Sequence, residues 1–325
     1  MSLKTNITTK RKSVSTEKQS ALEKATLKKL KIKPLEQAFL DLGMGSKALR
    51  VHNCGSYLEI KTYIEDGSTK LHSGKFCSVR LCPMCSWRLS QKRFSNLSKV
   101  IETLHVSGKF HLLFLTLTIK NPEGENLKQT IEQMLKAWGY MSNKSPEFNR
   151  SVVGWFRAIE ITYNQEADTY HPHIHVVLAV KPYYFKGDYY ITQKEWISMW
   201  RSALKVDYDP VVDICKEYKK DKSSTLISEA SKYATKDSEY LISDNQDLTN
   251  KVVDILDKSL HRVRLIAYGG ILKEIYEKLN LDDSFKDKEK QVVDGVVLYI
   301  IHAYRWMIGF QKYKKIDTEL PIFKT

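Results

Sequence analysis

The chain has 325 residues, and its 52 Lys and Arg against 38 Asp and Glu give a formal net charge of +14 at pH 7. This excess favours a polyanionic partner, nucleic acid before membrane, and the length allows one large domain or two ordinary ones. Apolar runs too short for a bilayer span and a basic start without an apolar core argue against membrane and secreted classes, so we expect a cytoplasmic protein.

Positive charge is concentrated at the start of the chain. The first 35 residues contain ten Lys or Arg and two Glu. Two interpretations stay open: a mobile arm that binds DNA, and a solvated, partly helical tail without a partner. A short helix is expected next, over Leu35–Leu49.

A β-hairpin is expected after this helix. Ser56–Ile64 alternates in polarity, Asp66-Gly67 is a turn sequence, and Lys70–Phe76 returns the chain. The hairpin lies between the first cysteine of the chain and the next three, so it can bring all four together.

These four of the five cysteines have the spacing C-x22-C-x4-C-x2-C. They are Cys54, Cys77, Cys82 and Cys85. A C-x2-C pair supplies two thiolates to a tetrahedral zinc, which would be structural because four thiolates leave no open position. Reduced cysteines in a packed module are the alternative, and His52 or His72 could replace one sulfur.

A helix should follow the last of these cysteines and end near His105, since apolar residues recur at helical spacing. Arg88, Lys92 and Lys99 fall on another side of it. This basic face either binds the DNA backbone or is an ordinary solvated surface.

The next elements predict an antiparallel sheet. His111–Ile119 has the continuous apolar character of a central strand, Leu127–Met141 is an amphipathic helix, and Trp155–Tyr163 is a second strand. A short loop joins it to Thr169–Val180, so these two strands should pair antiparallel.

The strand Thr169–Val180 begins TYHPHIH, with three of the nine histidines at alternating positions. Residues two apart in a strand leave the same face, so His173 and His175 point together and suit a divalent metal, while His171 lies at the strand's mouth. Glu160 on the adjacent strand would be a third ligand. The alternatives are polar residues at a strand edge and a surface Glu.

A helix over Thr192–Leu204 and a strand over Val211–Ile214 come next. The helix expected over Thr225–Glu239 presents Glu229, Tyr233 and Lys236 on one face, with Lys232 one step around it. Two further helices are expected, Leu248–Leu256 and Val263–Leu279. A charged stretch, Asp282–Lys290, and the largely apolar run Val292–Phe310 follow them.

These residues together suit phosphodiester cleavage. A metal polarises the phosphorus, and the hydroxyl of Tyr233 can attack in line to form a covalent phosphotyrosine. Glu229 could take a proton from the tyrosine or from a water, and Lys232 or Lys236 could bind phosphate.

Four segments, in one order, resemble the rolling-circle replication initiators of small Gram-positive plasmids. HPHIH looks like the histidine-hydrophobic-histidine motif of the HUH endonucleases. FLTLTIKN at 114–121 is similar to that family's first characteristic strand, FCSVRLCPMCSWRLS at 76–90 to its cysteine segment, and EASKYATK at 229–236 to its tyrosine motif.

The resemblance implies a metal-dependent, site-specific nickase. Tyr233 would cut one strand of supercoiled origin DNA, leaving a 5′-phosphotyrosine link and a 3′-hydroxyl primer, and Glu229 would activate the water that ends replication. His173 and His175 would bind Mg²⁺ or Mn²⁺, with a third ligand on the preceding strand, which favours Glu160 over His171. The partners implied are plasmid origin DNA and a host helicase.

The fold implied is α+β, a palm-like central antiparallel sheet with flanking helices and a small Cys-rich zinc-binding insertion. Four regions follow. They are 1–50, the basic arm and helix; 51–106, the hairpin, Cys cluster and basic helix; 107–245, the nicking and joining core; and 246–325, a helical C-terminal region.

Three other functions stay open. A conjugative relaxase or an HUH transposase would use the same nucleophile. A non-enzymatic, zinc-dependent DNA-binding regulator would use only the cysteine module and the basic helix. A zinc amidohydrolase also uses His-x-His, but it needs further histidines downstream, where only His261 and His302 follow.

Overall fold

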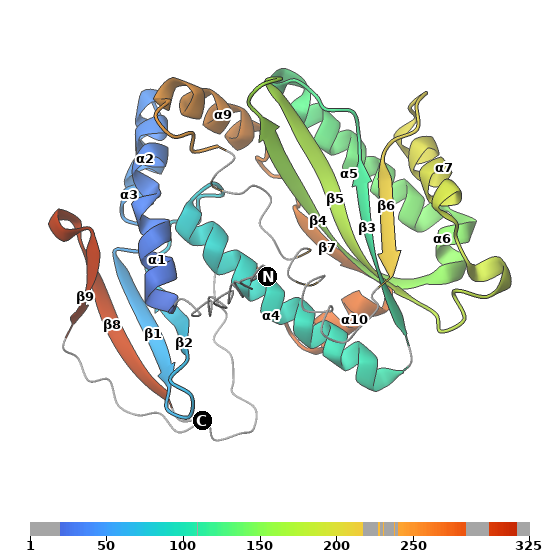
Figure 1. Cartoon of the computed structure of the whole chain (residues 1–325), viewed down its shortest axis with the longest axis horizontal. Helices are drawn as coiled ribbons and strands as arrows, with labels where there is room; N and C mark the ends of the chain where they lie inside the picture. The colour runs from blue at the N-terminus through green and yellow to red at the C-terminus, as the bar shows by residue number, and fades with distance from the viewer. Residues whose placement is uncertain are drawn as a thin grey trace, which may run out of the picture.

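The computed structural model of the chain describes residues 20–108, 110–216, 227, 230, 237, 240–283 and 299–316. The predicted α+β class is confirmed, since two antiparallel sheets are flanked by helices (Figure 1). The four-stranded sheet and the five-stranded sheet lie at opposite sides of this view, and the long helix α4 (Pro83–Ser107) runs from one toward the other.

The five-stranded sheet carries the histidine strand at its centre. Its order is β6 (Val212–Lys216), β3 (His111–Thr118), β5 (Thr169–Val180), β4 (Val152–Asn164) and β7 (Ile266–Gly269), and all neighbours are antiparallel. Residues 174–180 of β5 are all buried, because helices cover both faces of the sheet.

One face of this sheet packs against α5 (Leu127–Lys144) and α7 (Gln193–Leu204). Two fully buried tryptophans of α7, Trp196 and Trp200, form part of this core, and the indole of Trp200 donates a hydrogen bond of 2.7 Å to the Thr118 carbonyl. Because the two tryptophans are four residues apart, they lie on the same face of the helix.

The opposite face packs against the second half of α4 and against α10 (Gly270–Lys278). Val177 and Ala179 of β5 point this way, as do Phe114 of β3 and Phe156 of β4. Because side chains alternate along a strand, His173 and His175 leave the sheet on this same face. We call it the histidine face.

Local capping explains where several helices begin. Ser20 and Thr192 each form a capping box, with Glu23 at α1 (Ala21–Leu30) and with Glu195 at α7. Ser145 caps α6 (Pro146–Ser151). The short 3-10 turns are η1 (Gly124–Asn126), η2 (Gly187–Tyr189) and η4 (Ile308–Phe310).

The four-stranded sheet joins distant parts of the chain. Its order is β2 (Thr69–Gly74), β1 (Tyr57–Tyr63), β8 (Tyr299–Met307) and β9 (Lys312–Ile316). The hairpin predicted from the sequence is confirmed as β1 and β2. The region 246–325, which was expected to be helical, also contains the strands β7, β8 and β9, and burial in β8 alternates at Tyr299, Ile301 and Ala303.

Two predicted helices have different bounds. Leu35–Leu49 covers parts of two helices, α2 (Ile32–Asp41) and α3 (Gly45–His52), separated at Gly43, whose φ is +71°. Val263–Leu279 begins as strand β7 and turns into α10 at the two glycines Gly269 and Gly270.

The helix expected near Leu248 is present as α9 (Gln246–Ser259). Val292–Phe310 is described only from residue 299, where it forms β8 and η4. Within the described ranges, no helix has both the length and the apolar composition that crossing a bilayer requires.

Gly270 provides a stability test of the β7–α10 junction. Its φ is +55°, and a Cβ there would lie 2.2 Å from the Val153 carbonyl oxygen. We expect Gly270→Ala to lower the free energy of unfolding by about 2–4 kcal/mol, from left-handed strain and the clash, as measured by urea denaturation.

Gly139 on α5 is the matched control, since its Cβ position is open. Gly139→Ala should raise the free energy of unfolding by about 0.5–1 kcal/mol through helix propensity. Equal stability of Gly270→Ala and the wild type would contradict this view of the junction.

Candidate active site and metal centres

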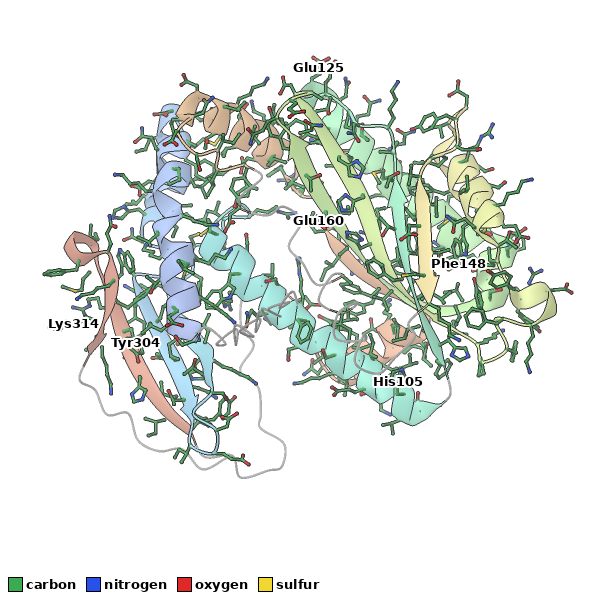
Figure 2. All side chains as sticks on the ribbon, in the orientation of Figure 1. His105, Glu125, Phe148, Glu160, Tyr304 and Lys314 are labelled. Carbon is green, nitrogen blue, oxygen red and sulfur yellow. The ribbon has the colours of Figure 1, made fainter. Side chains whose placement is uncertain are left out.

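Three buried side chains meet on the histidine face. Glu160 on β4 lies opposite His173 in the β4–β5 register, and His175 lies two residues further along β5. The Nε2 atoms of His173 and His175 are 3.3 and 3.0 Å from Oε2 of Glu160. Figure 2 labels Glu160 on its strand within the large sheet, well apart from His105 near the C-terminal end of α4.

Contacts behind the rings fix their orientation. Nδ1 of His173 lies 3.2 Å from the His171 carbonyl, and Nδ1 of His175 lies 3.2 Å from the Thr116 hydroxyl. A carbonyl only accepts, so Nδ1 of His173 carries a proton and Nε2 faces Glu160. Thr116, opposite His175 in the β3–β5 register, was not singled out from the sequence.

The spacing of these atoms suits a divalent cation. With bonds of about 2.1 Å, adjacent ligands lie about 3.0 Å apart around an octahedral ion and about 3.4 Å apart around a tetrahedral one, and the observed separations are 3.0 and 3.3 Å. Burial would raise the pKa of the Glu160 carboxyl, but the close contacts with the two imidazoles outweigh burial and hold that pKa well below its usual range. The site therefore offers an ionised carboxylate and two directed imidazoles.

His171 lies outside this cluster of potential ligands, although the sequence left it as an alternative to Glu160. Its Nδ1 is 2.8 Å from Oδ1 of Asn121. Burial and the two neighbouring histidines lower its pKa. The geometry thus brings together the set expected with Glu160.

The four clustered cysteines also meet. All four are buried, their sulfurs lie within 4.8 Å of one another, and no disulfide joins them. The sulfur of Cys85 is 3.6 Å from those of both Cys54 and Cys77. Four thiolates at about 2.3 Å from a tetrahedral zinc are about 3.8 Å apart, so the arrangement fits such an ion.

The cysteines meet because of their local structure. Cys82 is the N-cap of α4, Pro83 occupies the first turn, and Cys85 follows on the helix. Burial raises the pKa of Cys82, whereas hydrogen bonds from neighbouring thiols lower the pKa of Cys85. The predicted ligand set therefore exists as a cluster without either histidine substitute.

A lysine that the sequence did not single out lies against this cluster. Nζ of Lys29 on α1 donates hydrogen bonds of 2.7 and 2.6 Å to the carbonyls of His52 and Cys54. Only 7% of Lys29 is exposed, and burial lowers its pKa. Its positive charge offsets the negative charge of the thiolates beside it.

The basic face predicted on α4 differs from the structure. Arg88 is buried with its guanidinium 4.5 Å from the ring centre of Phe76, so it does not present a charge to solvent. Lys92 pairs with Asp282 at 3.1 Å, and Lys99 is exposed. Helical periodicity could not reveal that other segments cover the first two residues, and DNA binding by Lys99 stays a prediction.

Four predicted catalytic residues lie outside the described residues. They are Glu229, Lys232, Tyr233 and Lys236. Two described neighbours in the same segment, Ile227 and Ala230, are buried in the hydrophobic cluster of the histidine face. Phe114 belongs to that cluster, and its ring stacks on His175 at 5.3 Å.

The C-terminal end of this segment is also anchored. The buried carboxylate of Asp237 pairs with Lys28 at 2.6 Å and with Lys31 at 2.8 Å, both from α1 or its C-terminal end. Tyr240 is fully buried and its hydroxyl donates to the Leu81 carbonyl. Tyr240 is therefore poorly placed to act as a second nucleophile.

Comparison with known proteins identifies the family. A family model described as replication protein, Rep_1, matches residues 68–313. The chain belongs to this family. A "Protein rep" of Bacillus amyloliquefaciens is 38% identical over 83% of this chain and 85% of its own length, and one of Streptococcus pneumoniae is 40% identical over 77% of each.

A "Replication protein" of Staphylococcus aureus is 38% identical over 64% of this chain and 92% of its own length. No solved structure matches the chain. The resemblance to plasmid replication initiators, drawn from four short motifs, is thus confirmed at the level of the Rep_1 family.

The cysteine cluster of this Rep_1 protein can be tested by metal content. We expect Cys82→Ser to lose about one equivalent of bound metal and more than about 2 kcal/mol of unfolding free energy, because metal binding and folding are coupled. Metal content by mass spectrometry and denaturant titration measure both effects.

Cys215→Ser is the control, because Cys215 is the one exposed cysteine. It should retain wild-type metal content and stability. Full metal content in Cys82→Ser would rule out the four-cysteine site.

Proposed function

We propose that this Rep_1 protein initiates plasmid rolling-circle replication by nicking one strand of supercoiled origin DNA with Tyr233. The observation that carries the proposal is the arrangement on the histidine face. The Glu160, His173 and His175 cluster lies there, and Ile227 and Ala230, close to Tyr233 in sequence, are buried on the same face.

The nicking step is a transesterification. The hydroxyl oxygen of Tyr233 forms a bond to the phosphorus, and the bond from phosphorus to the 3′-oxygen breaks. The tyrosine proton leaves with a base, and the 3′-oxygen takes up a proton to become the primer hydroxyl. The product keeps a 5′-phosphotyrosine, so the energy of the phosphodiester is retained for rejoining.

The neighbouring residues have distinct proposed roles. Glu229 takes a proton from the water that hydrolyses the closing step, which ends a round of replication. Lys232 and Lys236 bind phosphate oxygens through their ammonium groups. These roles rest on the family resemblance of residues 229–236.

The two clusters suit different ions. By the family resemblance, Glu160, His173 and His175 would hold Mg²⁺ or Mn²⁺, and four thiolates suit Zn²⁺. Bound between Glu160, His173 and His175, a divalent ion would polarise the scissile phosphate and neutralise charge that develops on its oxygens. The zinc would hold β1, β2 and α4 together.

The proposed partners are double-stranded origin DNA, which is recognised, and a single strand, which is cut. A host helicase would unwind the duplex ahead of the 3′-hydroxyl primer. The net charge of +14 supports association with this polyanion.

A nicking assay on supercoiled plasmid that carries the protein's own origin, with Mg²⁺ or Mn²⁺, tests the nucleophile. Tyr233→Phe should abolish both the nick and the DNA-linked protein band, because it removes the attacking oxygen. Glu229→Ala should still nick but fail to release the completed circle. Glu160→Gln should slow nicking by about 100-fold.

Tyr240→Phe is the matched control and should nick at the wild-type rate, since its hydroxyl is buried on the Leu81 carbonyl. Normal nicking by Tyr233→Phe would exclude the tyrosine assignment. Failure to trap a covalent adduct with any variant that nicks would favour hydrolysis by water instead.

The ion pairs of Asp237 predict a positioning role. Asp237→Asn leaves the ammonium groups of Lys28 and Lys31 without their carboxylate, and because both lysines are partly exposed to solvent, the free energy of unfolding should fall by about 1–2 kcal/mol. We also expect kcat for nicking to fall by about tenfold at unchanged DNA affinity.

Lys258 is a suitable comparison, because its pair with Asp254 at 2.6 Å is exposed. Lys258→Ala should change stability by less than about 0.5 kcal/mol and leave nicking unchanged. Wild-type kcat in Asp237→Asn would show that Asp237 has no positioning role.

A further inference from the structure

A pocket of about 240 Å³ lies between α4, β7 and α10. These elements are neighbours in the fold, with α10 beside β7 and along the second half of α4 in Figure 1. Three arginines, two tyrosines and one aspartate contribute to its wall. They are Arg80, Arg93, Arg264, Tyr268, Tyr276 and Asp283.

The pocket is next to the Glu-His-His cluster. Ala158 pairs with Ile266 across β4 and β7, and the Ile159 amide donates a 3.0 Å hydrogen bond to the Leu265 carbonyl. Continuing this antiparallel register places Arg264 opposite Glu160. Because paired residues share a face, Arg264 leaves on the histidine face, one strand from the candidate metal ligands.

The arginines give the pocket a positive charge. Arg264 is exposed, and the backbone around it is held by a hydrogen bond of 2.9 Å from Arg80 to the Val263 carbonyl. Asp283 is the single acidic side chain of the wall, and its Oδ1 accepts a 2.8 Å hydrogen bond from Asn96. Three guanidinium groups against one carboxylate favour an anion, and guanidinium suits phosphate in particular.

The tyrosines give the pocket an aromatic side. Tyr268 is buried beneath Tyr276, with ring centres 4.3 Å apart, and Tyr276 is half-buried. Aromatic faces stack on nucleobases without regard to sequence. A cavity of about 240 Å³ has room for part of one nucleotide, such as its base, and is far too small for a duplex.

We infer that this pocket binds one nucleotide of single-stranded DNA close to the strand position that is cut, with its phosphate on Arg80 and Arg264 and its base against Tyr276. The inference rests on the proposed function for the direction of the DNA along the histidine face. It adds a binding site that would hold the opened strand in place across β7 while the neighbouring phosphate lies at Glu160.

Fluorescence anisotropy with a labelled single strand of about 20 thymidines tests the pocket, without added Mg²⁺ or Mn²⁺ so that no strand is cut. Arg264→Ala should weaken binding about tenfold and lower the salt dependence by about one phosphate contact. Tyr276→Leu should weaken binding about fivefold with little change in salt dependence.

Lys273→Ala is the control for charge. Lys273 lies on α10, is exposed, and forms only a 3.6 Å pair with Glu277, so the variant loses the same charge away from the pocket. It should change single-strand affinity by less than about twofold. Equal losses in Lys273→Ala and Arg264→Ala, or an equal loss of duplex and single-strand binding in Arg264→Ala, would overturn the inference.

The nicking assay tests the proposed chemistry, and the binding assay tests the pocket, so a wrong assignment in one does not affect the other. If Tyr233→Phe still nicks, the proposed chemistry is wrong, while the effect of Arg264→Ala on binding still reports on the pocket. If Tyr233→Phe is inactive and Arg264→Ala binds single strands like the wild type, only the pocket assignment is wrong.

Discussion

The antiparallel register of β4 and β5 is the constraint on which the candidate active site depends. Glu160 and His173 meet because they are cross-strand partners, and His175 joins them from the same face. A shift of one residue would turn Glu160 to the other face, into the core lined by α5 and α7. The apolar side chains on both faces of the sheet therefore fix the register and with it the residues that meet at the candidate site, since each register error would bury a charge without its partners.

Lysines on and beside α1 contact both the cysteine cluster and Asp237. Lys29 of α1 binds the backbone beside the cysteine cluster, and Lys28 and Lys31 bind Asp237 beyond the tyrosine motif. A short basic stretch, for which the sequence left open a DNA-binding arm or a solvated tail, thus contacts both the cysteine cluster and Asp237.

Features that depend on the spacing of residues close together in the chain could be predicted from the sequence. The hairpin, the four cysteines and the His-x-His strand each depend on spacing within a few residues, and Glu160 followed from one short loop between two strands. Features that depend on distant partners could not be predicted. Asp237 pairs with lysines 206 and 209 residues away, and nothing near it in sequence reveals them.

The predictions that differ from the structure also failed because they depend on contacts with other segments of the chain. The run around Tyr299–Met307 is apolar enough to read as a helix, and only its partner β1 decides that it is a strand. Arg88 falls on the polar side of α4 by periodicity, but Phe76 from the preceding segment covers it. Local periodicity therefore predicted which elements are regular, and tertiary contacts decided which of their faces are covered.

The place of β8 in the small sheet has a consequence for how the protein is made. Strand β1 pairs with β2 on one side and with β8 on the other, although β8 follows it by more than 200 residues. During synthesis, β1 must wait with one edge unpaired until nearly all of the chain has left the ribosome. An open edge of this kind invites pairing with other nascent chains, so the first part of the protein to be made is among the last to finish folding.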